Sequence, residues 1–256
     1  MSEFPNNETL LVFDGDLICY QKGFKHEKTE EWYIVEHDID SWIAEFFEKF
    51  GTYNYIIYLT GKNNFREQAA VSHPYKGQRT KPKPKWHGDI RSYLVALHNC
   101  KVVEGYEADD AYAMHLTRNK NTIGITIDKD LWQVEGWHYK FATHNSPEIP
   151  LRYITHEGSL ELTEKKKLVG TGMKWFYAQM LIGDRTDNIF GVPRCGDIGA
   201  YNALKECETE KECYDVVKEK YEAAFENPEE RLIENANLLY MIREKRNGEL
   251  VKWQAP

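Results

Sequence analysis

The stretch Leu10-Leu-Val-Phe-Asp14-Gly-Asp16 is a short, β-rich apolar run that ends in carboxylates. Two further runs of the same kind occur at Tyr55–Leu59 and Thr122–Ile127, and Asp128-Lys-Asp130 follows the second of them. Amphipathic stretches with apolar residues at helical spacing lie between these runs: Ile39–Phe50, Ile90–Leu97 and Ala108–Leu116. The alternation predicts an α/β fold with a mostly parallel sheet.

The composition excludes several classes of protein. The chain has 256 residues, 41% of them apolar, which is enough for a sizeable core. Its five cysteines form no CxxC pair, so we expect reduced thiols, no zinc site and a cytoplasmic location. No apolar run reaches the roughly 18 residues of a membrane span, and the polar start does not predict a secretory signal.

The net charge of −8 hides two local poles of opposite sign. From Lys62 to Lys85 there are seven basic residues and one acid, whereas from Glu206 to Asn235 there are eleven acids and four bases. The basic segment ends in Lys81-Pro-Lys-Pro-Lys85, where the prolines favour an extended chain. It is either a solvated loop or a surface that binds a polyanion.

Carboxylates gather at positions where ligands bind in parallel sheets. Asp14 and the pair Asp128 and Asp130 follow apolar strands, and ligands collect at the carboxyl ends of such strands. Glu107-Ala-Asp109-Asp110 opens a helix, and Asp184-Arg-Thr-Asp187 precedes a glycine turn. Each group alone has an ordinary structural explanation, since acids complement helix dipoles and turns. Together they repel unless cations neutralise them, and the absence of His or Cys beside them favours Mg²⁺.

The basic segment and a glycine-rich stretch supply groups that suit nucleic acid. Phe65-Arg66 and Tyr75-Lys76-Gly-Gln-Arg79 combine cations for phosphates with an aromatic ring that could stack on an end base. In Gly191-Val-Pro-Arg-Cys-Gly196-Asp-Ile-Gly199, glycines let backbone N–H groups approach a phosphate. A plain connection between two helices is the alternative interpretation of that stretch.

Two families share parts of this pattern. Asp14-Gly-Asp16 with the late Asp184 and Asp187 resembles the haloacid dehalogenase phosphatases, which use the first Asp as a nucleophile. That scheme leaves Glu107, Asp109, Asp110 and the basic segment unexplained. The whole ordered set, ending in Gly183-Asp184-x-x-Asp187-Asn-Ile-x-Gly-Val-Pro, resembles the 5′→3′ exonuclease and flap endonuclease family. This family includes phage exonucleases and the N-terminal domain of bacterial DNA polymerase I.

The resemblance implies a PIN-like α/β fold, a mostly parallel sheet flanked by helices. It implies a catalytic core over residues 1–160, with a helical arch at about 75–100. A helical region over 161–256 would follow, with a helix–hairpin–helix DNA-binding element at about 173–206.

The resemblance also assigns roles to residues. Asp14, Glu107 and Asp109 would serve a first metal site, and the other acids would complete the cluster and a second site: Asp110, Asp128, Asp130, Asp184 and Asp187. Lys76 and Arg79 would contact the scissile phosphate. The remaining DNA-binding residues would be Arg66, Tyr75, Lys81, Lys83, Lys85, Gly191, Val192, Gly196 and Gly199. The implied cofactors are two Mg²⁺ ions, with Mn²⁺ as a substitute, and a K⁺ ion held by the glycine hairpin.

The implied activity is metal-dependent hydrolysis of phosphodiester bonds from DNA 5′ ends or 5′ flaps by a monomer. RNA on RNA–DNA hybrids should also be cut, which gives an RNase H-like role in primer removal during phage DNA replication, in the host cytoplasm. The alternative is a non-catalytic protein of the same fold that binds branched DNA.

Three positions depart from the family pattern. Spacing places Leu59, followed by Thr60, where many members carry an aspartate before Phe65-Arg66. Gln21, with Lys22 beside it, stands at a position that is often basic, and the Gly196–Gly199 turn lacks a lysine. We therefore expect one carboxylate fewer at the first metal site, with water or Asp16 in its place, and a weaker phosphate grip at the hairpin.

Overall fold

The computed structural model describes residues 4–256, which form two compact units, each described here by itself. The first unit comprises the residues up to Asn63, Lys81–Ile127 and Gly136–Arg152. The second comprises Asn64–Thr80, Asp128–Glu135 and Tyr153–Pro256. Two short segments from the first part of the chain thus belong to the second unit, so the units do not follow the predicted boundary at residue 160.

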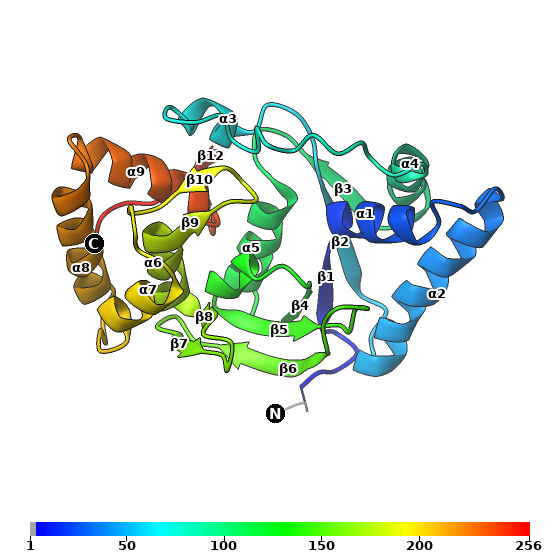
Figure 1. The fold of residues 1–256 in the computed structure, drawn as a ribbon. Coiled ribbons are helices and arrows are strands. Elements are labelled where there is room, and N and C mark those ends of the chain that lie inside the picture. The colour runs from blue at the N-terminus through cyan, green and yellow to red at the C-terminus, as the bar shows by residue number, and fades with distance from the viewer. Residues whose placement is uncertain (1–3) are drawn as a thin grey trace. The chain divides into compact units, whose positions relative to one another are not determined.

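The first unit is built on a six-stranded sheet in the order β3-β2-β1-β4-β5-β6 (Figure 1). The pairings β1 with β2, β2 with β3, β1 with β4, and β4 with β5 are all parallel. The predicted α/β fold with a mostly parallel sheet is therefore confirmed. The strands are β1 (Leu10–Asp14), β2 (Tyr55–Thr60), β3 (Cys100–Val103), β4 (Thr122–Ile125), β5 (Gly136–Lys140) and β6 (Ile149–Ile154).

Helices cover both faces of this sheet. Leu11 and Phe13 of β1 and Leu59 of β2 are buried in one core with apolar residues of α1, α2 and α4. On the other face α5 packs on β1, β2 and β4, so closely that a side chain at Gly124 would clash with the Tyr112 ring. Each fully buried aliphatic or aromatic side chain contributes about 1.5–3 kcal/mol. The helices are α1 (Gly15–Lys25), α2 (Trp32–Phe50), α4 (His87–Leu97) and α5 (Ala108–Arg118).

The helical part of the predicted arch is packed in the first unit. Ile90 and Leu94 of α4 are fully buried in its core, and α4 packs on α1. Its apolar face is thus covered by the unit, and the preceding residues 70–86 contain no helix. The end of the basic segment is held as well, because Lys85 Nζ donates to Thr29 O at 2.9 Å and pairs with Glu30 at 3.0 Å.

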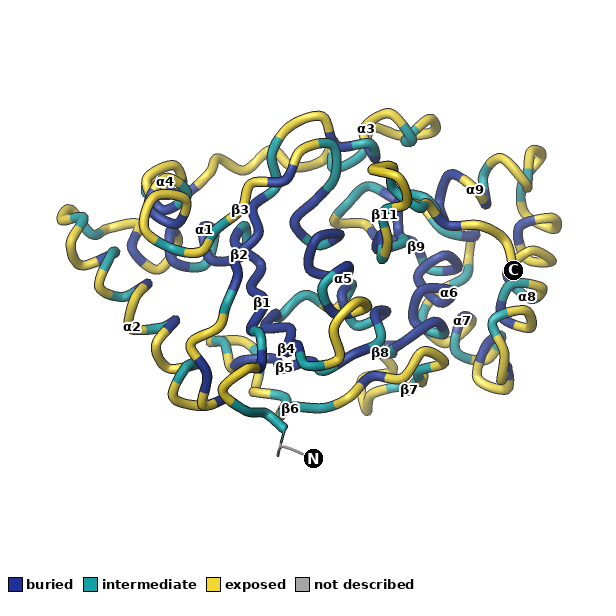
Figure 2. The backbone as a smooth tube through the Cα atoms, turned by 180° about the vertical axis from the view of Figure 1, so that it is seen from behind, coloured by how far each residue is buried: buried dark blue, intermediate teal, exposed yellow. Residues whose placement is uncertain are grey.

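The second unit is built around α6 (Gly172–Ile182), which is apolar on nearly all sides and buried along most of its length (Figure 2). It packs against α7, α8 and α9 and against a β7–β8 hairpin that precedes it. We expected a chiefly helical region from residue 160, so the hairpin is an addition. The larger elements are β7 (Ser159–Leu162), β8 (Leu168–Thr171), α7 (Asp197–Leu204), α8 (Glu210–Ala224) and α9 (Pro228–Leu239).

Short elements complete the second unit. They are α3 (Phe65–Ala69), a 3₁₀ turn (η1, Asp130–Gln133), β9 (Gly183–Asp184), β10 (Ile189–Phe190), β11 (Lys245–Arg246) and β12 (Glu249–Leu250). In β9 and β10 the chain turns back on itself, with Asp184 paired to Ile189 and Gly183 to Phe190. Over the described range 4–256, no helix is both long enough and apolar enough to span a membrane.

Candidate functional site

The first unit brings predicted acids to the carboxyl end of its sheet. Asp14 closes β1 and caps α1, since its Oδ1 accepts from Leu17 N at 3.1 Å. Glu107 and Asp110 form a capping box at the start of α5, in which Asp110 Oδ2 accepts from Glu107 N at 3.0 Å. Asp110 is fully buried, and Asp109 beside it is half-buried. Backbone N–H groups thus fix three of these four carboxylates.

Thr60 occupies the place that spacing assigned to Leu59. Successive side chains of a strand point to opposite faces. Leu59 is fully buried among α1, α2 and α4, whereas Thr60 faces α5 and its Oγ1 accepts from Ala108 N at 2.9 Å. The assignment to Leu59 was wrong by one residue, and a hydroxyl replaces the expected carboxylate next to Glu107.

Asp16 and Lys22 have structural partners in the first unit. Asp16 Oδ2 accepts from Thr60 N at 3.0 Å, and its Oδ1 lies 3.3 Å from Arg91, which also donates to Thr60 O. Asp16 therefore ties α4 to the end of β2. Lys22 is 4% exposed and pairs with Asp38 at 3.0 Å. It therefore does not replace the basic residue that the family often has at the position of Gln21.

The second unit holds a separate group of acids. Asp128 Oδ1 accepts from Asp130 N at 2.8 Å, and Asp130 Oδ1 accepts from Gln179 Nε2 at 2.5 Å. Asp184 is 5% exposed, and its Oδ1 accepts from Thr186 N at 2.7 Å. Lys129 lies against both motifs, with its Nζ 3.3 Å from Asp184 and 3.7 Å from Asp130.

Charge crowding in this group alters its pKa values. Burial raises the pKa of Asp128, and burial together with the Asp128 carboxylate raises the pKa of Asp130 well above its usual range. Burial alone would lower the pKa of Lys129, but Asp130 and Asp184 raise it. The group is therefore short of positive charge, and an added cation would stabilise its ionised form.

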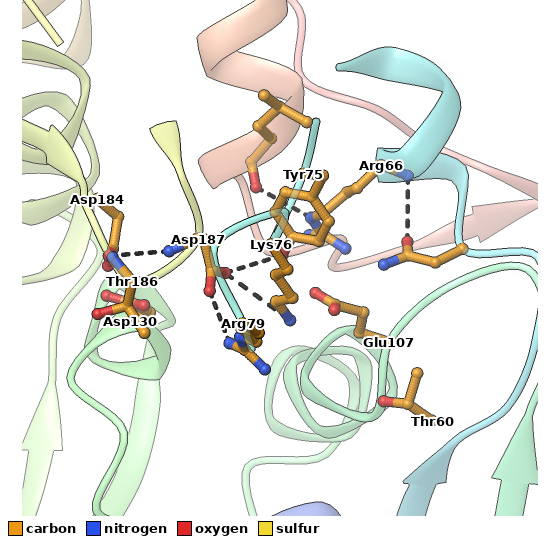
Figure 3. Close-up of polar contacts among 12 residues, drawn as sticks. Thr60, Arg66, Tyr75, Lys76, Arg79, Glu107, Asp130, Asp184, Thr186 and Asp187 are labelled. Carbon is orange, nitrogen blue, oxygen red and sulfur yellow. Dashed lines mark hydrogen bonds and ion pairs between the residues drawn. The ribbon is translucent and has the colours of Figure 1, made fainter. Parts of the chain in front are cut away.

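The Tyr75–Arg79 turn is fastened to Asp187 in the same unit (Figure 3). Asp187 accepts from Tyr75 Oη at 2.9 Å and Arg79 at 2.7 Å, and Lys76 Nζ lies 3.7 Å away. Lys76 N also donates to Asp187 O at 2.9 Å. Asn188 adds a second tie, because it donates to Pro74 O at 2.9 Å and accepts from Gln78 at 2.6 Å. Two motifs far apart in sequence thus place predicted phosphate-binding cations on a predicted metal ligand.

The donors present suit a hard divalent cation. They are carboxylate oxygens without His or Cys, the ligand type that Mg²⁺ and Mn²⁺ prefer. The Lys129 ammonium lies between Asp130 and Asp184, which marks a place where positive charge is already stabilised. Across residues 4–256, no three His, Cys, Asp or Glu side chains stand in a ready-made metal-binding group. Lys129 and the Asp187 partners would therefore have to give way to an ion in the second unit.

Two predicted DNA contacts have structural roles instead. Arg66 is 0% exposed, and its guanidinium donates to Leu238 O at 3.0 Å and Tyr240 O at 2.7 Å. Val192 N donates to Leu181 O at 2.8 Å, and its side chain packs in the core of the second unit. Neither group is presented to a phosphate, because both are used to hold the unit together.

The glycine stretch divides into a packed and an open part. A side chain at Gly191 would strike the backbone at Leu181 and Gly183, so this glycine allows two chain segments to cross. Gly196 is the N-cap of α7 and has open space around its Cα, and Gly199 in the first turn is exposed. The first N–H groups of a helix have no acceptor within the helix. The turn from Gly196 to Gly199 therefore remains suited to phosphate contact.

The other predicted contacts differ in how accessible they are. Lys81 and Lys83 are exposed, whereas Lys85 is engaged with Glu30. Tyr75 is half-buried against the core of the second unit, with its hydroxyl bound to Asp187. Lys129 and Gln179 were not predicted. Gln179 could have been recognised as a lone amide in a mostly apolar helix. Lys129 could not, because a lysine between two aspartates is not a distinctive sequence pattern.

Comparisons with known proteins agree with this architecture. No protein-family model matches the chain. DNA polymerase I of Borreliella burgdorferi is 30% identical over 156 residues, which are 57% of this chain and 16% of the polymerase. The chain therefore spans only a small part of that relative.

Solved structures match over most of the chain. The zinc-bound 5′-exonuclease of bacteriophage T5 superposes with a TM-score of 0.61 at 18% identity, covering 89% of this chain and 88% of that chain. A pseudo-enzyme–product complex of the bacteriophage T5 flap endonuclease with DNA and metal ions gives 0.59 at 16% identity, covering 91% and 89%. The chain thus has the fold of these T5 enzymes, and the fold that the resemblance implied is confirmed.

Proposed function

We propose that the chain is a divalent-metal-dependent nuclease that hydrolyses phosphodiester bonds at DNA 5′ ends and 5′ flaps. One observation carries the proposal: Asp187 holds Arg79, 108 residues away in sequence, at 2.7 Å, and Lys76 lies beside it. Cations bind the phosphate, and carboxylates bind the metal ions. Phosphodiester cleavage by two metal ions requires both kinds of group.

Each unit contributes carboxylates to this proposal. Asp14, Glu107 and Asp109 of the first unit would hold one ion, and Asp128, Asp130, Asp184 and Asp187 of the second unit would hold the other, with Asp110 supporting Glu107. When bound, divalent ions activate water and stabilise charge on the attacking and leaving oxygens. Gln179 orients Asp130, and Thr186 N orients Asp184, so both carboxylates are held in place before an ion arrives.

Lys76 and Arg79 would bind the scissile phosphate. In the structure Asp187 engages both cations, so an incoming phosphate competes with this carboxylate for them. Phosphate binding would release Asp187, and the same cations would then offset the charge that develops on the phosphate. Binding of DNA and of metal in the second unit is therefore coupled.

The finer points of the proposal concern substrates and ions. Mg²⁺ is the proposed ion, with Mn²⁺ as a substitute, and the Gly191–Gly199 hairpin would hold K⁺ through its carbonyls. The substrates would include RNA on RNA–DNA hybrids, consistent with primer removal in phage DNA replication by a monomeric enzyme. The T5 enzyme matched above, a flap endonuclease bound to DNA and metal ions, supports the substrate class.

The first experiment is cleavage of a 5′-labelled duplex, a 5′ flap and an RNA–DNA hybrid, each in Mg²⁺ and in EDTA. We expect short products from the 5′ end in Mg²⁺ only, and their sizes separate exonuclease from flap cutting. Cleavage that persists in EDTA would overturn the metal assignment.

Thr60 favours a second candidate, a non-catalytic protein that binds branched DNA. A hydroxyl in place of a carboxylate leaves the first unit with one metal ligand fewer. If the protein binds flap DNA but cuts nothing in Mg²⁺ or Mn²⁺, this candidate holds. The variant Thr60→Asp then tests whether the missing carboxylate explains the lack of cleavage, because its side chain can still accept from Ala108 N. A gain of cleavage would show that Thr60 is the reason why the wild type does not cut DNA.

A further inference from the structure

An exposed aromatic pair lies in the second unit beside the Tyr75–Arg79 turn. The rings of His73 and Phe190 have centroids 4.5 Å apart and an interplanar angle of 45°. Phe190 is 45% exposed, and Val71 near His73 is 85% exposed. Single exposed apolar residues are ordinary on protein surfaces. Here two rings from segments more than a hundred residues apart meet on the surface.

Buried polar residues of α9 hold the segment that carries His73. Glu234 accepts from Val71 N at 2.8 Å, from Ser72 N at 2.7 Å and from Ser72 Oγ at 2.5 Å. Its own side chain is 8% exposed. Although burial would raise the pKa of Glu234, the Ser72 hydroxyl and the other donors lower it. The carboxylate therefore stays ionised and fixes the backbone directly before His73.

The same helix holds the strand that carries Phe190. Phe190 O accepts from Asn235 Nδ2 at 2.9 Å and from Arg231 at 3.1 Å, and Asn235 is fully buried. Arg231 also pairs with Glu234 at 2.9 Å, which links the two anchors. Three polar residues on one helix thus hold the backbone segments that carry the two exposed rings.

The ring pair lies next to groups assigned to phosphate. His73 precedes Lys76 by three residues, so the chain between them spans at most about 11 Å. Phe190 follows Asp187 by the same interval, and Asp187 contacts Lys76 and Arg79. Aromatic rings beside cations are the arrangement by which proteins bind unpaired nucleotides.

We propose that His73 and Phe190 form a stacking platform for an unpaired nucleobase of the DNA strand whose phosphate Lys76 and Arg79 bind. The inference rests on the proposed function and adds to it a site for the base. Tyr75, predicted to stack on an end base, is less suited to this role, since its hydroxyl is bound to Asp187 and its ring packs against the core. The platform would favour substrates with unpaired 5′ nucleotides over fully paired ends.

The test measures binding and stacking instead of cleavage. 2-Aminopurine is placed in turn at each of the three unpaired flap positions nearest the junction, and binding is followed in Ca²⁺ with the DNA checked for integrity on a gel. For one position we expect the wild type to quench 2-aminopurine and to bind about tenfold more tightly than to the same flap with an abasic site. Phe190→Ala and His73→Ala should lose both the quenching and the preference for a base.

Three variants separate stacking from folding. Phe190→Tyr keeps an aromatic ring and should retain quenching, whereas Phe190→Leu keeps an apolar side chain and should lose it. Ile233→Ala alters a residue of α9 that is also 45% exposed and should behave as the wild type. Thermal melting of each variant should match that of the wild type, because neither ring is buried.

The outcomes distinguish this inference from the proposed function. If Phe190→Leu quenches and discriminates as the wild type does, or if the wild type binds abasic and normal flaps equally, the platform is overturned, and Mg²⁺-dependent cleavage by the wild type leaves the nuclease proposal intact. If the wild type binds no DNA and cuts none, both proposals fail together.

Discussion

The carboxylates at the start of α5 and those beside α6 are held in different ways. In the first unit Asp14, Glu107 and Asp110 accept from backbone N–H groups at helix starts. In the second unit Asp130 is held by the Gln179 amide and Asp187 by Arg79, Lys76 and Tyr75. Asp128 and Asp184 of the second unit also accept from backbone N–H groups, so the acids whose partners are movable side chains are Asp130 and Asp187.

The difference teaches what each set is able to do. A backbone donor is in place as soon as the helix forms, so the first-unit carboxylates keep their geometry whether or not a ligand is present. A side-chain partner can rotate away, so Asp130 and Asp187 could exchange partners if the proposed phosphate and metal ion bind. We therefore expect substitutions of Asp14, Glu107 or Asp110 to affect folding as well as activity, and substitutions of Asp130 or Asp187 to affect mainly activity.

Asp130→Asn should have the largest effect. The amide keeps an acceptor for Gln179 but removes the charge that binds the ion, so cleavage should fall at least about 100-fold. DNA affinity should stay the same or rise, because one charge that repels phosphate is gone. Single-turnover cleavage and anisotropy on the same flap measure both. Asp215→Asn on the exposed face of α8 is the control, and cleavage at the wild-type rate by Asp130→Asn would show that the metal assignment is wrong.

Lys76→Ala should separate catalysis from binding. Loss of a cation that stabilises the developing charge should slow single-turnover cleavage by about 100-fold. DNA affinity should fall only a few-fold, since the other cations of the segment remain. Lys211→Ala, which removes an exposed lysine of α8, should change neither quantity. Equal losses of rate and affinity would make Lys76 a tether and remove its proposed role in the transition state.

Asp110→Ala should test the comparison through stability. It removes the reciprocal cap of α5 from a fully buried position, and caps contribute about 0.5–2 kcal/mol. Asp187→Ala, which removes a half-buried carboxylate with side-chain partners, should cost less than half as much. Urea unfolding midpoints of the two variants provide the measurement. Equal costs would contradict the distinction between fixed and movable partners.

Asp38→Asn should have the smallest effect and a defined pH window. Asp38 belongs to the first unit but is held by cations; although burial alone would raise the pKa of its carboxyl, hydrogen bonds from Lys25, His26 and Lys22 lower it well below its usual range. A lowered carboxyl pKa contributes stability above the unfolded value of about 4, and this contribution is lost as the pH falls.

Urea unfolding of the wild type and Asp38→Asn from pH 6 down to pH 3 should therefore show a difference on the order of 1 kcal/mol that shrinks below about pH 4. Asp40→Asn offers a matched control, because Asp40 is a more exposed acid on the same helix. A difference that stays constant across this range would show that the charge of Asp38 is not what stabilises the unit.

Local signals were sufficient for the sheet and for much of the candidate site. The apolar runs that precede Asp14 and Asp128 and the acidic start of α5 are visible within a few residues. The structure places Asp14 at the end of β1, Asp128 in the loop after β4 and the acids 107–110 at the start of α5. The Leu59 error has an equally local cause. A strand alternates its faces with every residue, so a placement that is wrong by one residue selects the opposite side of the sheet.

The remaining errors have distant causes. Arg66 was assigned to DNA because it is basic, but its partners Leu238 and Tyr240 lie 172 and 174 residues further along the chain. The contact of His73 with Phe190 likewise depends on how α9 packs. No local sequence pattern in either segment indicates which distant residues it contacts. Whether an arginine is exposed to bind phosphate or is buried and donates to backbone carbonyls depends on the tertiary packing.

The contacts of Arg66, Val71 and Ser72 with α9 also determine when this part of the chain can reach its native arrangement during synthesis. Glu234 lies 163 residues after Val71. The partners of Arg66, Leu238 and Tyr240, lie 172 and 174 residues after it. At about 5–20 residues per second, a ribosome needs roughly ten to thirty seconds to make the intervening chain. Throughout that time the residues before the Tyr75–Arg79 turn lack the helix that holds them, so Val71 and Ser72 can reach their native arrangement only after α9 has been made.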